Sequence, residues 1–541
     1  MKKYTLSTIS VSIILYFALP FVTFSQDGSL DLTFDNDGIV NTSLIGFYTP
    51  QYICDGSTFA VTIQADGKIV TAGGIYALAR YNTNGNLDNT FGTAGIVMSE
   101  FEDPGSGQSM TANSIAIQAD GKILSAGTCL NCYNWGGWRF GITRRNTDGS
   151  LDNTFGTAGI VLTSIGNGSG GGSNSRIFGL AIQADGKIVV AGEGNNYMFA
   201  LARYNTNGSL DNTFGTAGIV TFNNNISGGK AVKIQSDGKI VVLVEQYISS
   251  QYVFALTRHN TNGSLDLTFS GDGVVTTAIG LSSAHAKDLA IQGDGKIVVA
   301  GDANGDFALT RYNTNGSLDI TFGTAGIVTT NIYPVWNDNF ECPNAISIQA
   351  DGKIVAAGYS NYGFTLARYK TNGNIDNTFG TAGIVATPDV DDNYTNPHTS
   401  EQAAYDFARA IAIQADGKIV AVGDYISYGD ELGNGVMDKP IKVVRYNNSL
   451  TGDISENSNI SSQISIYPNP FSNSTTLKTN NIFENATFIV FNTLGEQVRK
   501  IDNISGQTFT FYRENLEQGI YFYQLKENNI IVSENKFVIT D

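Results

Sequence analysis

The stretch RIFGLAIQADGKIVVAG, residues 176–192, decides the fold of this chain. Its first half alternates apolar with small or polar residues, its second half is rich in β-branched residues, and Asp185-Gly186 stands between them. Asp-Gly between two such runs is a strong signal for a β-hairpin, because both residues tolerate the backbone that tight turns require. We therefore predict two antiparallel strands here, joined by the turn Ala184–Gly186.

The same hairpin recurs along the 541 residues. The string IQADGKIV, with small variations, starts at Ile63, Ile117, Ile182, Ile234, Ile291, Ile348 and Ile413. A second string, close to SLDNTFGTAGIV, contains Leu30, Leu87, Leu151, Leu210, Leu265, Leu318 and Ile375. A third, close to LARYNTNG, carries Arg80, Arg144, Arg203, Arg258, Arg311, Arg368 and Arg445. The unit at 159–208 divides into the four strands GIVLT, RIFGLAIQ, KIVVAG and MFALARYN, and such repeats predict a β-propeller.

The two ends of the repeat region favour a closed ring over an open solenoid. The first unit begins inside the long loop, at residues 27–30, and the last ends inside the same loop, at residues 448–450. A solenoid needs atypical capping repeats, whereas two ends at one phase of the repeat suit closure. We predict an all-β chain with a seven-bladed propeller over 26–450, Asp27–Val40 lying near Lys442–Leu450. The sequence leaves open which strand is innermost and whether the terminal strands share a blade.

The beginning of the chain has the pattern of a secretory signal peptide. Lys2 and Lys3 precede an apolar run from about Ser10 to Phe24, and cleavage after Ser25 fits the small residues there. Residues 1–25 are therefore expected to be removed. We find no second long apolar run, which predicts no transmembrane segment in the mature chain. The formal net charge of −17 disfavours nucleic acid as a partner.

The repeats resemble the delta-60 repeat, a family of exported bacterial proteins, over about residues 27–450; this resemblance implies a fold and no particular activity. After a polar linker at 451–462, the segment 463–541 predicts a small β-sandwich. Its motifs are Tyr467-Pro468-Asn469-Pro470, the turn ending at Gly495, Gly519-Ile520-Tyr521 and Lys536 in the final strand. It resembles the type A C-terminal sorting domain of the type IX secretion system of Bacteroidota. The resemblance implies the secretion machinery as a partner and an extracellular or outer-membrane surface location, reached through the periplasm.

Successive turns of an up-and-down blade alternate between two faces, so the ring has one constant and one variable face. The Gln-Ala-Asp-Gly-Lys hairpins and the NTNGSLDNTFGTAG loops share one face and hardly vary. The remaining connections differ in every unit, and function usually depends on such loops. The aromatic candidates for ligand binding there are Tyr133, Trp135, Trp138, Tyr333, Trp336, Tyr394 and Tyr425. Packing of the long loops against one another explains them equally well.

The recurring aspartates favour structure over chemistry, because a catalytic site needs one asymmetric constellation. Seven-fold repetition suits turn geometry and Arg–Asp pairing between strands. No cofactor is expected; calcium at Asp389, Asp391 and Asp392 is the alternative to a solvated loop. Cys129 and Cys132 have the spacing of a local disulfide or of two thiols, and no second pair exists for zinc. The states of Cys54 and Cys342 stay open.

The sequence favours a secreted or surface-attached protein that binds a glycan or protein ligand without catalysis. We find no nucleophile-elbow, zinc-helix or phosphate-loop motif in it. The alternative is an extracellular polysaccharide-acting enzyme, a hydrolase or lyase, whose carboxylates and tyrosines lie on the variable face. One pocket holding a unique set of close carboxylates would favour the enzyme.

Overall fold

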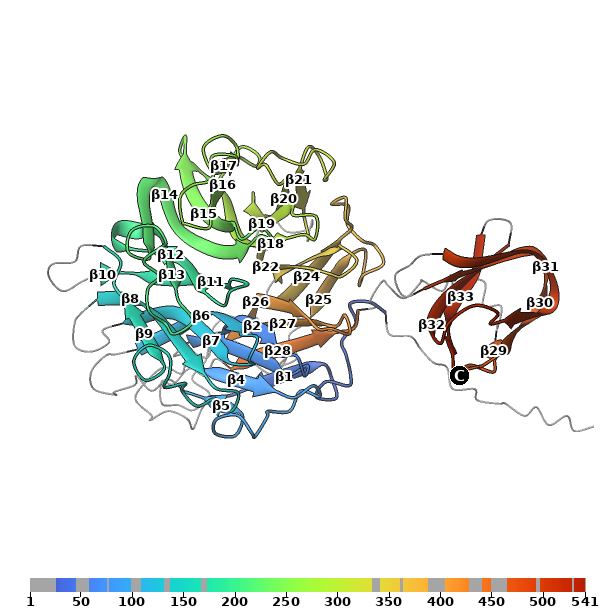
Figure 1. Cartoon of the computed structure of the whole chain (residues 1–541). Coiled ribbons are helices and arrows are strands. Elements are labelled where there is room, and N and C mark those ends of the chain that lie inside the picture. Colours follow the sequence, from blue (N-terminus) through green and yellow to red (C-terminus); the bar gives the residue numbers. More distant parts are fainter. Residues whose placement is uncertain are drawn as a thin grey trace, which may run out of the picture. The chain divides into compact units, whose positions relative to one another are not determined.

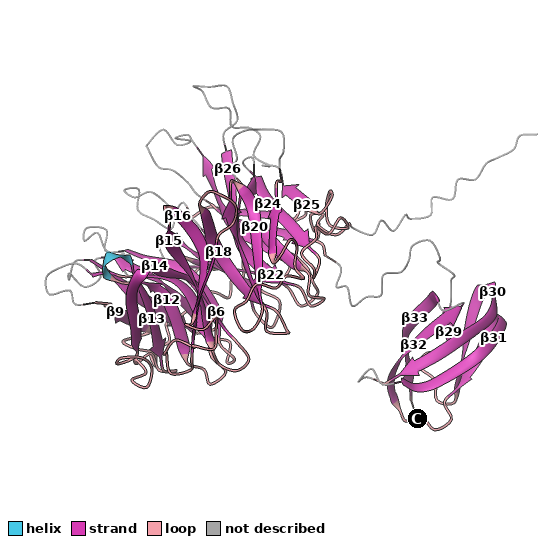
Figure 2. Ribbon diagram, turned by 90° about the horizontal axis from the view of Figure 1, so that it is seen from above, coloured by secondary structure: helices cyan, strands magenta, loops and turns pink. Residues whose placement is uncertain are grey.

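A computed structural model describes the chain at residues 26–44, 58–74, 77–98, 109–130, 137–166, 173–332, 341–360, 363–387, 404–427, 440–448, 465–492, 497–527 and 530–540. These residues fall into two compact units, one within 1–449 and one within 450–541. Apart from a short 3-10 turn, Asn195–Tyr197, the regular elements are strands (Figure 2). The described part of the chain contains no helix that is long and apolar enough to cross a membrane.

The first unit is the predicted propeller of seven four-stranded antiparallel blades (Figure 1). Blade 1 comprises β2 (Thr58–Ile63), β3 (Ile69–Gly73), β4 (Leu78–Tyr81) and β5 (Ile96–Val97). Blade 2 comprises β6 (Ser109–Ile117), β7 (Ile123–Leu130), β8 (Gly137–Arg145) and β9 (Ile160–Thr163), with β10 (Ser173–Asn174) added parallel to β8. Blade 3 comprises β11 (Arg176–Ile182), β12 (Ile188–Glu193), β13 (Met198–Tyr204) and the first part of β14 (Ile219–Ile234).

The second part of β14 opens blade 4, which continues with β15 (Ile240–Ile248), β16 (Gln251–His259) and β17 (Val274–Thr277). Blade 5 comprises β18 (Ala284–Ile291), β19 (Ile297–Ala303), β20 (Asp306–Tyr312) and β21 (Ile327–Thr330). Blade 6 comprises β22 (Cys342–Ile348), β23 (Ile354–Ser360), β24 (Gly363–Tyr369) and β25 (Ile384–Thr387). Blade 7 comprises β26 (Ala404–Ile413), β27 (Ile419–Ser427), β28 (Ile441–Tyr446) and β1 (Ile39–Thr42).

The ring is closed by the strand nearest the N-terminus. β1 pairs antiparallel with β28, with Ile39 opposite Val444, and the amide of Gly28 donates to the carbonyl of Asn447 at 2.7 Å. The first strand of each blade contacts the first strands of both neighbouring blades, including β2 with β26. These strands are therefore the innermost, and the predicted closure is confirmed. The GIVLT strand at the start of each sequence unit is the outermost strand of the preceding blade, as β9 against β8 shows.

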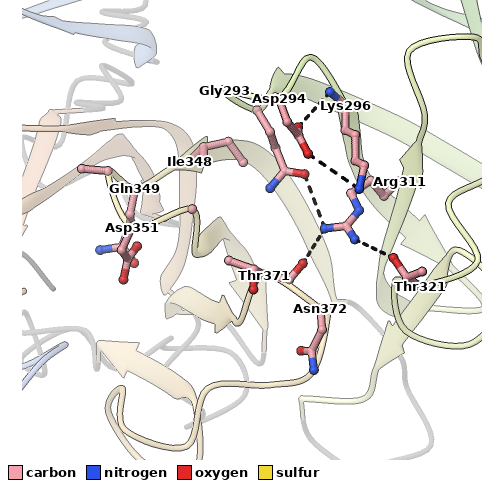
Figure 3. Close-up of a pocket in the computed structure, with 13 residues that line it drawn as sticks. Gly293, Asp294, Lys296, Arg311, Thr321, Ile348, Gln349, Asp351, Thr371 and Asn372 are labelled. Atoms are coloured by element: carbon pink, nitrogen blue, oxygen red, sulfur yellow. Dashed lines mark hydrogen bonds and ion pairs between the residues drawn. The ribbon is translucent and has the colours of Figure 1, made fainter. Parts of the chain in front are cut away.

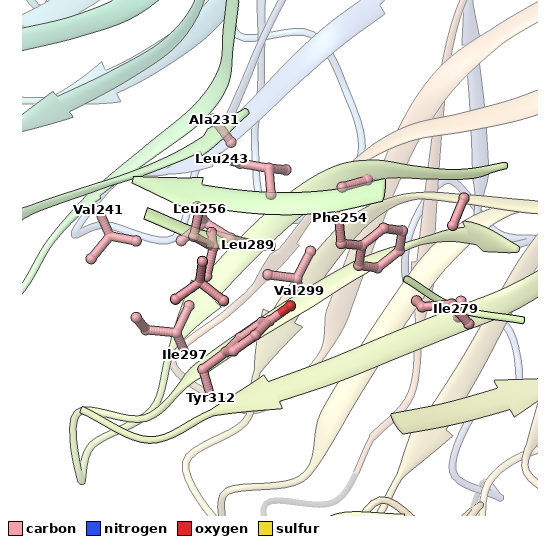
Figure 4. Close-up of a cluster of buried hydrophobic side chains, with 14 of the residues drawn as sticks. Ala231, Val241, Leu243, Phe254, Leu256, Ile279, Leu289, Ile297, Val299 and Tyr312 are labelled. Carbon is pink, nitrogen blue, oxygen red and sulfur yellow. The ribbon is translucent and has the colours of Figure 1, made fainter. Parts of the chain in front are cut away.

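The core lies between neighbouring blades, which explains why the middle strands are buried on both faces. Leu243, Phe254 and Leu256 of blade 4 pack with Leu289 and Val299 of blade 5 (Figure 4). Burying one such side chain stabilises a protein by about 1.5–3 kcal/mol. Hydrogen bonds cross the same boundaries: a buried tyrosine of one blade bonds a threonine in the outermost strand of the preceding blade. These pairs are Tyr81–Thr42, Tyr204–Thr163, Tyr312–Thr277, Tyr369–Thr330 and Tyr446–Thr387.

Every innermost strand carries a β-bulge near the variable face. In blade 3 the register shifts between Ile177 and Gly179, so Phe178 is the extra residue. The facing residue is Gly192, where a Cβ would lie 1.8 Å from the carbonyl oxygen of Arg176, so only glycine fits. The bulged residues in the other blades are Phe59, Asn113, Lys287, Asn344 and Arg409, and 228–230 in blade 4. A bulge re-aims a side chain, and the residue presented at this equivalent place varies among the blades: it is basic in some, aromatic or amide-bearing in others.

The second unit is a curled sheet built from β29 (Ser465–Tyr467), β30 (Ser474–Phe491), β31 (Gln497–Tyr512), β32 (Gly519–Glu527) and β33 (Ile530–Ile539). β30 pairs with β31 on one side and, in succession, with β29 and β32 on the other. Register shifts between Lys478 and Phe488 bend this hairpin. The sheet wraps around a core that includes Phe488, Phe511 and Phe537, so the predicted all-β tail is confirmed as one curled sheet.

Candidate functional site

The constant face of the propeller is occupied by a network of internal bonds. In blade 3, Asp211 Oδ2 accepts from Arg203 Nε at 2.8 Å and from Lys187 Nζ at 3.1 Å. The backbone and hydroxyl of Thr213 donate to Asp211 Oδ1 at 3.1 and 2.7 Å. The Arg203 guanidinium lies 4.5 Å over the Phe214 ring, and its Nη1 donates to the carbonyl of Thr261 in the next blade. The arginine therefore joins its strand to the following loop and its blade to the next one.

The network recurs in all seven blades, so the predicted Arg–Asp pairing is present in each. The pairs are Arg80–Asp88, Arg144–Asp152, Arg203–Asp211, Arg258–Asp266, Arg311–Asp319, Arg368–Asp376 and Arg445–Asp31, with Nε–Oδ2 distances of 2.7–2.9 Å. Burial raises the pKa of Asp266, but hydrogen bonds from Thr268 and Lys239 and the charge of Arg258 outweigh it and bring the pKa to about 2. These aspartates are therefore ionised structural anchors.

A cavity of about 600 Å³ opens on the constant face between blades 5 and 6 (Figure 3). The charged groups on its wall belong to the same network. Lys296 contacts Asp294 at 3.6 Å and Asp319 at 3.0 Å, and Arg311 donates to Gln292 and to the carbonyl of Thr371. These groups hold the two blades together. The cavity is therefore a space between two blades, and the charged groups on its wall already pair with one another.

The variable face has a different pattern, because four blades place a basic side chain near the bulge and a carboxylate on the next strand. The rim pairs, as we call them, are Arg176–Glu193 at 3.5 Å, Lys230–Glu245 at 3.0 Å, Lys287–Asp302 at 3.5 Å and Arg409–Asp424 at 2.9 Å. The basic side chains are 31–33% exposed and the carboxylates 2–21%. Each rim pair therefore points its cation toward solvent and keeps its carboxylate behind.

One rim pair continues into an exposed aromatic group. Glu245 Oε2 bonds Lys230, and Oε1 lies 2.8 Å from Nδ1 of His285 in blade 5. The His285 ring is 4.9 Å from the ring of Tyr252, which is 5.0 Å from the ring of Tyr247. Tyr247 and Tyr252 are 53% and 37% exposed. They face each other across the end of the β15–β16 hairpin, which we call the tyrosine hairpin.

Two further contacts extend this group. Gln251, at the tip of the tyrosine hairpin, donates to the carbonyl of Leu281, and Leu281 is 94% exposed. On the blade 3 side, Arg176 lies 3.6 Å over the ring of Trp138. The tyrosine hairpin is thus linked to the loop before blade 5, Arg176 covers Trp138 of blade 2, and nothing like this group recurs among the described blades.

The two carboxylates nearest the tyrosine hairpin have opposite electrostatic surroundings. Burial raises the pKa of Glu193, and the charges of Arg176 and Lys230 only partly oppose it. Burial also raises the pKa of Glu245, but the charge of Lys230 and the hydrogen bond from His285 outweigh it and lower the pKa below its usual value. Both carboxylates are held in ion pairs. This arrangement suits carboxylates that orient neighbouring basic side chains more than carboxylates that contact a substrate directly.

The thiol of Cys342 lies at the variable-face end of β22. Its Sγ donates to Asp302 Oδ1 at 3.3 Å, and burial raises the pKa of the thiol to about 12. It is a free thiol, which settles its disulfide state. A thiol with so high a pKa stays protonated at neutral pH and is a poor nucleophile.

Of the aromatic residues predicted for ligand binding, Trp138 is in β8, half-buried beneath Arg176. Tyr425 lies in β27, but its side chain is outside what the structure describes. Tyr133, Trp135, Tyr333, Trp336 and Tyr394 lie outside the described residues, as do Cys54, Cys132, Gly495 and the calcium candidates Asp389, Asp391 and Asp392. Cys129 is disulfide-bonded, and its partner lies outside the same ranges. Among the described residues, no cluster of three or more His, Cys, Asp and Glu could hold a metal ion.

The tail motif ties the start of the second unit to its last strand. Asn469 Oδ1 accepts from the amide of Val538 at 2.8 Å, and its Nδ2 donates to the carbonyl of Lys536 at 3.2 Å. Tyr467, Pro468 and Pro470 beside it are exposed. Gly519 begins β32, and the hydroxyl of Tyr521 donates to the carbonyl of Glu517 at 3.0 Å. The motif residues therefore serve the fold of this unit while leaving one end of it exposed.

The fold and the sites define the class of the protein as a seven-bladed β-propeller followed by a separate β-sheet unit. Comparison with family models gives matches to the beta-propeller described as a domain of unknown function, DUF5122, at residues 64–91, 118–155, 183–214, 235–269, 292–322, 349–379 and 414–437. Residues 465–540 match the secretion system C-terminal sorting domain. The repeats of the chain thus match DUF5122 β-propeller repeats, and its tail matches a type IX secretion sorting domain. The tail implies interaction with that machinery and delivery to the cell surface or extracellular space.

Solved structures resemble the propeller only distantly. A streptogramin B lyase is 12% identical with a TM-score of 0.41, over 76% of this chain and 97% of that one. Extracellular domains 1–2 of Drosophila semaphorin 1b are 8% identical with a TM-score of 0.37, over 78% and 87%. Such likenesses carry no information on activity. Among curated proteins, none matches the chain in sequence.

Proposed function

We propose that this secreted propeller is a non-enzymatic binding protein that holds an extracellular ligand on its variable face. The observation that carries the proposal is the exposed tyrosine hairpin set against His285, Glu245 and Lys230. This group is asymmetric, whereas the constant face repeats itself and has its charges paired internally. An asymmetric exposed group on a rigid frame is the usual form of a recognition site.

The chemistry of the group suits a ligand with flat, partly polar units. Tyrosine offers an apolar ring for stacking and a hydroxyl for hydrogen bonding. Lys230 and His285 are fixed by Glu245, so their N–H groups are oriented before a ligand arrives. Pre-oriented donors lose little conformational entropy on binding.

One specific observation favours a second candidate function, that of a polysaccharide hydrolase or lyase. Glu193 and Glu245 lie in adjacent blades, and their pKa values are shifted in opposite directions. Two carboxylates with diverging pKa values are the arrangement that acid–base catalysis uses. Their ion pairs and burial favour the binding function. Release of reducing ends or unsaturated products from polysaccharides, abolished by Glu193→Gln, would support the enzyme instead.

The test of the binding function is a screen of the mature full-length chain against glycan arrays and cell-surface proteins. Each hit is then titrated with Tyr247→Ala and Tyr252→Ala. We expect a loss of affinity of about fivefold or more for each, as for exposed aromatic anchors. The matched control is Ile320→Ala, a large exposed apolar residue on the constant face. Full affinity in both tyrosine variants, or an equal loss in the control, contradicts the proposal.

A further inference from the structure

The rim pairs share one orientation. Each cation comes from the innermost strand, at its bulge or within two residues of it, and each carboxylate from the second strand of the same blade. The innermost strands surround the ring axis, so the four cations lie round the axis at the variable-face end. In blade 7 the contrast is greatest, since Arg409 is 32% exposed and Asp424 only 2%.

The rim cations keep donors beyond those that their carboxylates use. An ammonium carries three N–H groups and a guanidinium five. Asp424 accepts the Nε–H of Arg409 at 2.9 Å, and Glu245 accepts from Lys230 at 3.0 Å. A ligand oxygen approaching from solvent meets these donors first, while the carboxylate behind holds each donor in place.

We propose that the ligand of this face is an acidic polysaccharide, one that carries carboxylate or sulfate groups on its sugar rings. The inference rests on the proposed binding function and names its ligand class. Its rings stack on Tyr247 and Tyr252, and its anionic groups bond the rim cations Arg176, Lys230, Lys287 and Arg409.

The exposure pattern selects an anionic ligand over a cationic one. A cationic ligand meets the exposed rim cations first and would have to displace one of them to reach a carboxylate, and bringing like charges together is strongly unfavourable. An anionic group instead adds to a rim cation without breaking its pair, and charge-assisted hydrogen bonds are the stronger kind.

Two features favour a polysaccharide over other anions. The tyrosine hairpin offers ring faces beside His285, which shares Glu245 with the rim cation Lys230, and such faces suit sugar rings. The cations recur from blade to blade, which fits a polymer with one charge per repeating unit. The net charge of −17 provides no long-range attraction for such a polymer, so its capture depends on these local contacts.

The experiment measures binding of the mature full-length chain to polygalacturonate, chondroitin sulfate, dextran and poly-glutamate at one fixed ionic strength. We expect both acidic polysaccharides to bind, and dextran and poly-glutamate to bind at least tenfold more weakly. Lys230→Gln and Arg409→Gln should each lower the affinity by roughly tenfold, the loss expected for one charge-assisted hydrogen bond. Lys230→Arg should retain binding, and Lys370→Gln, an exposed lysine on the constant face, should change nothing.

Melting curves of every variant separate lost binding from lost folding. Dextran bound as tightly as polygalacturonate, or unchanged affinity in a well-folded Lys230→Gln, overturns the acidic-ligand inference and leaves the proposed function standing. Poly-glutamate bound as tightly as the polysaccharides overturns the sugar class. Absence of any ligand that depends on the tyrosine hairpin overturns the proposed function itself.

Discussion

Two aspartates of the repeat, Asp185 and Asp211, look equivalent in sequence and should behave differently when replaced. Asp185 sits in the hairpin turn, is mostly exposed, accepts from the amide of Lys187 at 3.1 Å, and lies 3.7 Å from its ammonium. Asp211 is buried and holds Arg203, Lys187 and Thr213 at once. We expect Asp211→Ala to be much the more destabilising change.

The magnitudes follow from these contacts. Asp211→Ala leaves the guanidinium of Arg203, which is 6% exposed, without its carboxylate. Breaking a buried pair by removing one partner costs about 3–5 kcal/mol. Asp185→Ala removes a solvent-exposed ion pair, worth at most about 1 kcal/mol, and frees an amide that water can bond. The free energies of unfolding should therefore differ by about 2 kcal/mol or more.

Guanidinium denaturation followed by circular dichroism tests this difference. Asn212→Ala, at the exposed neighbour of Asp211, is the control and should stay within about 0.5 kcal/mol of the unaltered protein. Asp319→Ala should reproduce Asp211→Ala, because Asp319 makes the same contacts to Arg311 and Lys296. Equal losses for Asp185→Ala and Asp211→Ala, or a loss below 1 kcal/mol for the latter, would refute the reasoning.

Four further outcomes are expected. The network aspartates, such as Asp266, have folded pKa values below the unfolded value of about 3.9, so their stabilisation is complete above about pH 4 and disappears toward pH 2; a melting temperature constant down to pH 2 would contradict this. Gly192→Ala should prevent folding or cost more than about 3 kcal/mol, since its Cβ meets the carbonyl of Arg176; normal melting would argue against the bulge. Asp406→Ala should cost about 3–5 kcal/mol by stranding the buried Lys442, and adding Lys442→Ala should recover part of the loss, as double-mutant denaturation can show. Deleting residues 464–541 should leave the protein in the periplasm on cell fractionation, and undiminished surface delivery would contradict that role of the tail.

The sequence predicts the blade number and closure because turn residues mark every repeat. It does not predict which blade contains the strand Ile160–Thr163. Each blade has four strands whether that strand pairs with the blade before it or with the blade after it in the sequence. The choice depends on long-range pairing, and in the structure the strand pairs with the blade before it. The same choice makes β1 the last strand of blade 7.

The candidate site is predicted less well, for two physical reasons. Bulges break the alternation on which strand patterns rest, so Lys230 and Arg409 could not be assigned to the same face from their spacing. The bond between Glu245 and His285 joins residues 40 apart in neighbouring blades and depends on the register of both. The sequence does contain a signal for the tyrosine hairpin, because QYISSQY at 246–252 places two tyrosines symmetrically about a Ser-Ser turn. Ligand binding by Trp138 stays a prediction, and the sequence does not show that Arg176 covers its ring.

Because β1 pairs with β28, the ring can close only after almost the whole propeller has been synthesised. Asp31 and Arg445, whose ion pair accompanies that pairing, are 414 residues apart, so the first strand of the propeller to be synthesised finds its partner last. A chain that stops short of β28 leaves β1 and its blade with open edges, and open edges pair with other chains or attract proteases. In the full-length propeller only the innermost and outermost strands of a blade keep an edge, so an incomplete copy differs from a finished one by the additional edges that it exposes.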